Sequence, residues 1–323
     1  MTAPKNKAIA IGDVTVVAGR RKRFDIPVAR LTTGSPLSMP VAVLNGRRPG
    51  PTVWLSGAIH GDEINGVEII RQVLPLVDVR TLRGAIIATP VVNVFGFIEQ
   101  SRYLPDGRDL NRFFPGSARG SLASRLAKMF MTEVVAQSDL GIDLHTAAGH
   151  RTNVPQIRAD LDHHETLRLS NAFGAPYIID ARLRDGSLRM AATKREVPVL
   201  LYEAGQIHRF DTDAVLYGVE GVLRVLQAMD MGSWELPRVR RKPIRLGSSR
   251  WVRARRSGIA TLRVAPGDKV EQGENLGEIS DAFGQRPTRI NAPMDGHVIA
   301  ITQNPLVSQG DALVHLGQEY RES

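Results

Sequence analysis

The sequence contains no cysteine among its 323 residues. This absence excludes a disulfide framework, a cysteine nucleophile, an iron–sulfur cluster and a zinc–thiolate finger. Any metal site in the chain must therefore use nitrogen and oxygen ligands. With 42% hydrophobic and 23% charged residues, the chain can build a large core, and we expect one large domain or two unequal ones.

Long apolar runs are also missing. One long uncharged stretch, from Gly84 to Ile98, contains Pro90, Asn93 and Gly96, so it is too short and too broken to span a bilayer. The first residues lead into strand-like sequence without the apolar run of a signal peptide. We expect a soluble cytoplasmic protein with no membrane partner.

One segment, residues 238–256, contains no acidic residue. It holds nine basic residues, which are Arg238, Arg240, Arg241, Lys242, Arg245, Arg250, Arg253, Arg255 and Arg256. The whole chain has 42 basic and 33 acidic residues and a formal net charge of +9, so without these nine it is formally neutral. In a strand, these arginines would lie on both faces, so we interpret the segment as a charged edge strand that faces solvent or a second subunit. Phosphate binding is the alternative, but no nucleic-acid motif supports it, and we expect no nucleic-acid partner.

Short runs rich in Val and Ile predict a meander of strands before residue 50. They cover Ala8 to Val17, Phe24 to Leu31 and Leu37 to Leu44. From Pro51 onward, apolar strand runs alternate with helical periodicity. Strands are predicted at 52–59, 84–94, 140–144, 177–179 and 197–202, and helices near 67–77, 122–134, 162–173, 186–196 and 214–229.

This alternation favours an α/β fold, with a mostly parallel sheet, helices on both faces and sites beyond the carboxyl ends of the strands. After residue 236 the helical pattern stops, and short strands separated by Gly, Pro and Asp predict a small all-β domain. The predicted organisation is an N-terminal set of strands over 1–50 that packs on a catalytic domain over 51–236, followed by a C-terminal β domain over 237–323.

His60 and Glu63 lie three residues apart where a predicted strand gives way to a helix. At the start of a helix this spacing places both side chains on one side, where they can hold a single metal ion. The alternative is an ordinary helix start, in which Asp62 and Glu63 interact with the helix macrodipole.

His145 ends the apolar run Leu140-Gly-Ile-Asp-Leu-His, at the place where a doubly wound sheet collects its functional groups. Asp143 lies two residues earlier, on the same face of the strand, and can orient a metal-bound imidazole. His60, Glu63 and His145 together form a His₂Glu set with an open fourth position, which is a catalytic zinc composition.

Two further groups suit chemistry beside such a metal. Glu203 ends the strand Val197-Pro-Val-Leu-Leu-Tyr-Glu, where its carboxylate can move a proton between the attacking water and the leaving amine. In the Arg-rich loop 101–116, Arg112 can clamp a substrate carboxylate and Arg102 can stabilise a developing oxyanion. The alternatives are a solvated strand end and a solvated turn.

Four motifs resemble the succinylglutamate desuccinylase and aspartoacylase family, within the broader zinc carboxypeptidase-like group. They are His-Gly-Asp-Glu at 60–63, Asp-Leu-Asn-Arg-Phe-Phe-Pro-Gly at 109–116, Asp-Leu-His-Thr at 143–146 and Tyr-Glu-Ala-Gly at 202–205. They occur in the family's order, and the resemblance covers roughly residues 50–230. It implies a zinc carboxypeptidase-like α/β domain with a mixed sheet, followed by a small β domain.

The resemblance also implies residue roles. It implies that His60, Glu63 and His145 bind one zinc ion, that Glu203 is the general acid and base, and that Asn111 and Arg112 hold the substrate carboxylate. Arg102 and Arg158 are further candidates, for catalysis and for carboxylate binding respectively. A zinc-dependent deacylase of an N-acyl amino acid or related small amide is therefore expected. A carboxypeptidase for short peptides and an inactive scaffold are the alternatives, and a homo-oligomer is possible.

The C-terminal stretch from Gly258 onward resembles the flattened barrel of biotinyl and lipoyl carrier domains. Such carriers attach their cofactor to a lysine at an exposed hairpin tip. The only lysine after residue 242 is Lys269, in a Pro-Gly-Asp-Lys-Val turn. We therefore expect this module to be structural, shaping the active site or forming an oligomer contact.

Overall fold

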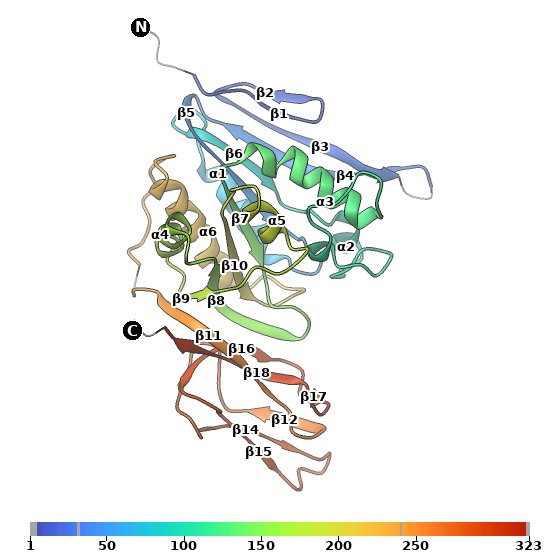
Figure 1. The fold of residues 1–323 in the computed structure, drawn as a ribbon, viewed down its shortest axis with the longest axis vertical. Helices are drawn as coiled ribbons and strands as arrows, with labels where there is room; N and C mark the ends of the chain where they lie inside the picture. The colour runs from blue at the N-terminus through green and yellow to red at the C-terminus, as the bar shows by residue number, and fades with distance from the viewer. Residues whose placement is uncertain (1–4, 31–32, 240, 321–323) are drawn as a thin grey trace.

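The computed structural model describes residues 5–30, 33–239 and 241–320. A body of helices and strands is followed by a strand-rich C-terminal region, and together they form an elongated molecule (Figure 1). No helix in these residues is long and apolar enough to cross a membrane.

Within the described residues, twelve strands form one mixed sheet in the order β13-β16-β18-β11-β9-β8-β10-β7-β5-β6-β4-β3. Their bounds are β3 Arg20–Arg30, β4 Pro36–Asn45, β5 Arg48–Gly57, β6 Arg83–Thr89, β7 Leu140–His145, β8 Arg151–Ala159, β9 Tyr177–Asp180, β10 Val199–Gly205, β11 Ile244–Arg253, β13 Lys269–Val270, β16 Gly296–Thr302 and β18 Ala312–Glu319. In the centre, β10, β7, β5 and β6 run parallel. β8 breaks this pattern because it pairs antiparallel with β10. The predicted mixed α/β architecture is confirmed.

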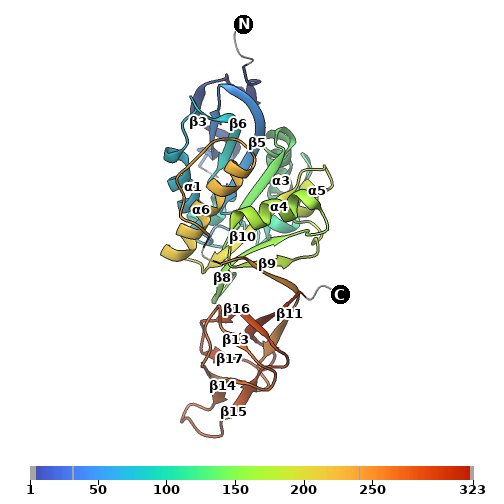
Figure 2. The same cartoon turned by 90° about the vertical axis from the view of Figure 1, so that its left-hand side faces the viewer.

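Six α-helices within the described residues cover the two faces of this sheet. They are α1 Asn65–Leu76, α2 Val94–Ile98, α3 Leu122–Glu133, α4 His164–Phe173, α5 Leu188–Thr193 and α6 Thr212–Ala228, with 3-10 turns η1 Leu110–Arg112 and η2 Val135–Gln137. One core joins α1, α4 and α6 to the sheet, and a second joins α3 and α5 to the opposite face. The view in Figure 2 shows α1 and α6 together on one side and α3 on the other.

The structure differs from the sequence predictions at three places. The run Ala8 to Val17 is a hairpin, β1 Ile9–Ile11 and β2 Val14–Val16, because Gly12 turns the chain with a φ of 52°. The strand predicted over 84–94 ends at Thr89, since Pro90 has no N–H to donate and Asn93 caps α2. The prediction also missed β8 entirely. Leu31, at the end of one predicted strand, and Arg240, in the basic segment, lie outside the described residues.

The C-terminal region is rich in strands, as predicted. β11 continues the large sheet from β9, and β16 pairs with β8. The remaining strands β12 Gly258–Leu262, β14 Asn275–Ser280, β15 Thr288–Asn291 and β17 Leu306–Val307 form a second sheet, and the two enclose a small apolar core. The likeness to carrier domains and the domain boundaries at 50 and 236 stay predictions.

The core between α4, α6 and β10 gives a test of the fold. Phe173 is fully buried, and its ring centroid lies 5.0 Å from that of Tyr202. We expect Phe173→Ala to lower the free energy of unfolding by about 3–5 kcal/mol, because it leaves a cavity. Phe283→Ala serves as the control, since that ring is 88% exposed, and it should change stability by less than about 0.5 kcal/mol. Urea unfolding of both variants measures the difference, and equal effects would contradict this packing.

Candidate active site

His60, Glu63 and His145 meet because β5 and β7 are parallel neighbours. Ser56 and Gly57 at the end of β5 pair with Asp143 and Leu144 of β7, so the loop after β5 lies beside the end of β7. His145 is the last residue of that strand. The carboxyl ends of adjacent parallel strands thus bring the three side chains together.

The pair His60 and Glu63 lies in a turn before α1, not at a helix start as predicted. The N–H of Glu63 donates to the carbonyl oxygen of His60 over 3.1 Å, and the helix begins only at Asn65. Gly61 makes this turn possible, since a Cβ there would lie 1.9 Å from the carbonyl carbon of Gly96. Close backbone packing, rather than helical spacing, puts the two side chains on one side.

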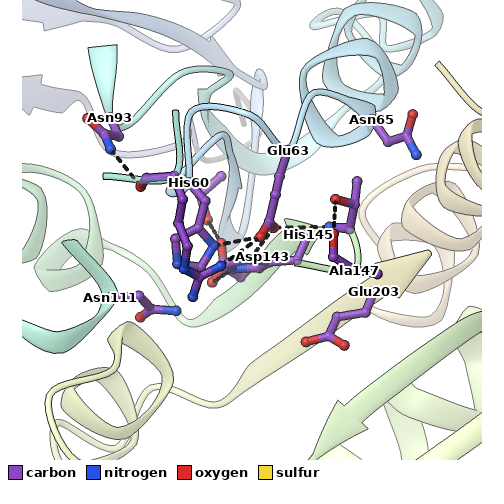
Figure 3. A network of polar contacts seen from close by, with 12 residues as sticks. His60, Glu63, Asn65, Asn93, Asn111, Asp143, His145, Ala147 and Glu203 are labelled. Carbon is purple, nitrogen blue, oxygen red and sulfur yellow. Dashed lines mark hydrogen bonds and ion pairs between the residues drawn. The ribbon is translucent and has the colours of Figure 1, made fainter. Parts of the chain in front are cut away.

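The three side chains are buried and close together (Figure 3). Glu63 Oε1 lies 2.8 Å from His60 Nδ1, and Glu63 Oε2 lies 2.8 Å from His145 Nδ1. A ring nitrogen of His60, a carboxylate oxygen of Glu63 and a ring nitrogen of His145 lie within 4.8 Å of one another. A buried His-Glu-His group of this kind can bind a metal ion.

The orientation of the two imidazoles fits such an ion. Nε2 of His60 lies 3.1 Å from Asp109 Oδ1, and Nε2 of His145 lies 2.9 Å from Asp143 Oδ2. Carboxylates that hold the outer ring nitrogen are the usual partners of metal-bound histidines. Both Nδ1 atoms therefore face the carboxylate of Glu63.

The charges in the cluster are strongly coupled. Burial alone would raise the pKa of Glu63, but the two histidines outweigh it and hold that pKa well below the usual value. Burial would lower the pKa of His145, yet Asp143 and Glu63 raise it well above the usual value. The carboxylates and imidazoles thus stabilise one another's charged forms, and a cation bound between them would take the place of the imidazole protons.

Asp109 is a functional candidate that the sequence reasoning missed. Besides His60, it contacts Arg102, whose Nη2 lies 2.9 Å from Asp109 Oδ2. These contacts lower the pKa of Asp109 against the opposing effect of burial. Its signal in the sequence was its place as the first residue of the Asp-Leu-Asn-Arg motif.

Glu203 stands beside the cluster because β10 is the parallel neighbour of β7, with Glu203 in register with His145. Three donors from β8 converge on its Oε2. Asn153 Nδ2 lies at 3.0 Å, Gln156 Nε2 at 3.4 Å and Arg158 Nη1 at 3.5 Å. The position of this carboxylate oxygen is therefore set by β8.

A bulge in β8 makes this convergence possible. Glu203 and Gly205 of β10 are two residues apart, whereas their ladder partners on β8, Gln156 and Asn153, are three residues apart. The extra residue shifts the alternation of side chains, so Asn153 and Gln156 both reach Glu203. The sequence reasoning missed both residues because it did not predict β8, a strand that contains Pro155 although proline is uncommon inside strands.

Arg102, Asn111 and Arg112 line the same cleft. Arg102 Nη1 lies 3.2 Å from Glu63 Oε1, so its guanidinium is fixed beside the candidate metal site. The side-chain oxygen of Asn111 accepts a hydrogen bond from the N–H of Leu188 at 2.8 Å, which leaves its NH₂ group able to donate to a ligand. Arg112 is exposed in the cleft.

Two other arginines change the predicted binding surface. Arg158 was predicted to bind a substrate carboxylate, but its guanidinium lies against Glu203. Arg189, which was not predicted, lies in the first turn of α5 and is only 7% exposed. Its Nη2 donates to the carbonyl oxygen of Arg182 over 2.8 Å, while its Nη1 is buried without a partner among the described residues. An unpaired buried guanidinium beside the cleft is suited to an anion, but nothing in the sequence marks Arg189 as buried.

The cleft has a volume of about 800 Å³, and its far wall comes from the C-terminal region. Ser249 and Trp251 of β11 and His315 of β18 form this wall. The rings of Trp251 and His315 are stacked at 4.4 Å. Burial, together with Arg158 and Arg151, lowers the pKa of His315 to about 3, so this histidine is neutral at neutral pH.

Metal binding can be tested directly. Wild-type protein should bind one divalent ion per chain and melt at a higher temperature when Zn²⁺ is added, because a ligand that binds only the folded state stabilises it. His60→Ala and His145→Ala should lose both effects, whereas His208→Ala should keep them, since His208 lies at the surface outside the cluster. Elemental analysis and thermal melting give the answer, and unchanged metal content in all three variants would contradict the assignment.

The chain is similar to several known proteins. Residues 49–229 match the model of the succinylglutamate desuccinylase/aspartoacylase catalytic domain. The N-alpha-acetyl-L-2,4-diaminobutyric acid deacetylase of Halomonas elongata is 29% identical over 307 residues, which are 87% of this chain and 85% of that protein.

Solved structures show the same architecture over almost the whole chain. A succinylglutamate desuccinylase/aspartoacylase from Rhodobacter sphaeroides has a TM-score of 0.85 at 26% identity, with 97% of this chain and 99% of that chain covered. The product-bound ectoine utilization protein EutE (DoeB) from Ruegeria pomeroyi shares the fold, with a TM-score of 0.83 at 22% identity and the same coverage. Since the family model spans more than half of the sequence, the chain belongs to the succinylglutamate desuccinylase/aspartoacylase family.

Proposed function

We propose that the protein is a zinc-dependent deacylase, which hydrolyses the amide bond of an N-acyl amino acid into a carboxylic acid and an amine. Family membership makes the chain a hydrolase of such amide bonds. The observation that carries the zinc-dependent mechanism is the placement of Glu203 in register with His145, beside the buried group of His60, Glu63 and His145.

In this proposal one zinc ion is held by Nδ1 of His60, Nδ1 of His145 and the carboxylate of Glu63. Zinc fits this nitrogen and oxygen set, and the cysteine-free sequence offers no thiolate alternative. When bound, it lowers the pKa of its water to about 7 and polarises the substrate carbonyl. Asp109 and Asp143 keep the outer ring nitrogens protonated, so the inner nitrogens stay free to bind the ion.

Glu203 is the proposed general base and acid. It takes a proton from the attacking water and delivers it to the nitrogen of the leaving amine. The hydrogen bonds from Asn153 and Gln156 both use its Oε2, which leaves Oε1 as the oxygen that carries the proton. Asn153, Gln156 and Arg158 act as positioning residues, because they contact Glu203 and hold it in place.

The arginines of the cleft are proposed to bind the charged parts of the substrate. Arg112 and the side-chain NH₂ of Asn111 bind a carboxylate, and the buried Nη1 of Arg189 offers a second contact for an anion. Arg102, fixed by Glu63 and Asp109, is placed to stabilise negative charge on the carbonyl oxygen as water adds.

The Halomonas relative supports an N-acetylated diamino acid as substrate, since its name gives Nα-acetyl-L-2,4-diaminobutyrate. The family name adds N-acetyl-aspartate and N-succinyl-glutamate as candidates.

The proposed chemistry is tested by release of free amine from a panel of these three N-acyl amino acids and short peptides. Wild-type enzyme loaded with zinc should hydrolyse one acyl amino acid. Glu203→Gln should lower kcat by about 10²–10⁴-fold, because the amide cannot accept the proton, while zinc content stays unchanged. Loss of zinc in Glu203→Gln would mean a ligand role, and cleavage of peptides alone would replace the deacylase with a carboxypeptidase.

The positioning of Glu203 by β8 gives a separate prediction. Asn153→Ala and Gln156→Ala should each lower kcat by about 10-fold or more, because a displaced base reduces the rate without changing ground-state binding. KM and zinc content should stay close to the wild-type values. Asn171→Ala is the matched control, since its side chain bonds only to Leu167 within α4. A rise in KM at constant kcat would show that these residues bind substrate instead.

A further inference from the structure

A second groove lies next to the cleft, on the other side of Trp251. Trp251 lines both cavities. The groove runs between β11 and β15 and is bordered by residues 250–253 of one strand and 288–291 of the other. Its apolar lining includes Val252, Ile279 and Ile290, and its volume is about 250 Å³. This is below the range of about 300–1,000 Å³ that is usual for small-molecule pockets.

Both strands that border the groove have an unpaired edge there. β11 pairs with β9 only over Ile244–Leu246, and from Ser248 to Arg253 its ladder partner is β18 alone. β15 is the last strand of its sheet, with β14 as its ladder partner. Alternate backbone N–H and C=O groups of an edge strand point outward, so each edge can pair with an added strand.

The charged side chains that line the groove are all basic, while Glu278 of β14, the ladder neighbour of Arg289, forms its ion pair with Arg263. Four exposed arginines line the groove, which are Arg250, Arg253, Arg255 and Arg289. No acidic residue lines it, and none of the four arginines forms an ion pair with a described residue. The proposed function gives these arginines no task.

We propose that this groove is a docking site for an extended, acidic segment of a partner protein. The segment adds as a β-strand to the free edge of β11 or β15, and its carboxylates contact the arginines along the rim. The main-chain bonds supply affinity for an extended chain, and the acidic side chains supply selectivity. This inference goes beyond the deacylase function and does not depend on it.

Four unpaired arginines also suit other anions, but the open strand edges favour a peptide. A nucleic acid or an inorganic phosphate would use the charges without the backbone groups. A second copy of this chain would need an acidic extended segment of its own to match the groove. Each of these occupants is distinguished by the experiment below.

The test uses the full-length protein and a fluorescent octapeptide of alternating Glu and Val, followed by anisotropy. Binding is expected, and it should weaken as salt is added. The Lys and Val octapeptide should not bind. The Glu and Val peptide with alternate backbone nitrogens methylated should bind at least about 10-fold more weakly, because it cannot donate to the strand edge. Amide hydrogen exchange should slow in residues 248–253 and 288–291.

Charge-reversal variants complete the test. Arg250→Glu/Arg289→Glu should weaken binding by at least about 10-fold, and Arg119→Glu/Arg125→Glu is the matched control with two exposed arginines far from the groove in the fold. If the first variant melts earlier than wild type, Arg250→Gln/Arg289→Gln replaces it. Three outcomes would overturn the proposal. The first is equal binding of the methylated peptide, and the second is binding of an oligonucleotide or pyrophosphate but not of the peptide. The third is self-association that Arg250→Glu/Arg289→Glu abolishes, without any peptide binding.

Discussion

The buried carboxylate of Glu63 is the group that the whole site depends on. It contacts both imidazoles and Arg102, and it accepts a hydrogen bond from the N–H of Thr146 at 3.0 Å. A carboxylate with almost no exposed surface is costly unless it is paired on every side. The loop after β5, the end of β7 and the Arg102 loop all supply those partners, so the placement of three separate segments is fixed by one side chain.

The mixed sheet brings the residues around Glu63 together with Glu203, the proposed general base. Parallel pairing of β5, β7 and β10 brings the metal candidates and Glu203 to the same edge. The antiparallel strand β8 then adds what a purely parallel sheet would lack, because its bulge directs Asn153 and Gln156 at the carboxylate of Glu203. In the proposed mechanism, the parallel strands assemble the reacting groups and the antiparallel one orients the base.

The sequence predicted the α/β class and the residues that lie at strand ends, since His145 and Glu203 each close an apolar run that can be recognised without a structure. It could not predict which groups contact them. Asn153 and Gln156 depend on a strand that contains proline, and Arg189 depends on the packing of a short helix. The turn at His60 shows the same limit. The spacing to Glu63 was informative, but the helix predicted there begins only at Asn65, two residues after Glu63. Patterns along the chain indicate where strands and helices end, whereas contacts between distant segments depend on the register of the strands in the folded sheet.

The C-terminal strands are part of the site because they continue the same sheet. β16 pairs with β8 and β11 pairs with β9. One strand therefore separates β8, whose side chains contact Glu203, from each of the strands that carry Trp251 and His315. Arg151 of β8 lies 5.1 Å from the ring centroid of Trp251. Burial lowers the pKa of His315, and the positive charges of Arg158 and Arg151 lower it further, so His315 is neutral. The cleft is already lined by arginines, and its far wall thus adds an aromatic surface but no further positive charge. Trp251 also borders the groove between β11 and β15, and a strand added there would contact the same side chain that closes the catalytic cleft. Substrate recognition and partner binding would then share one wall, and rigid pairing in the sheet is what would couple them.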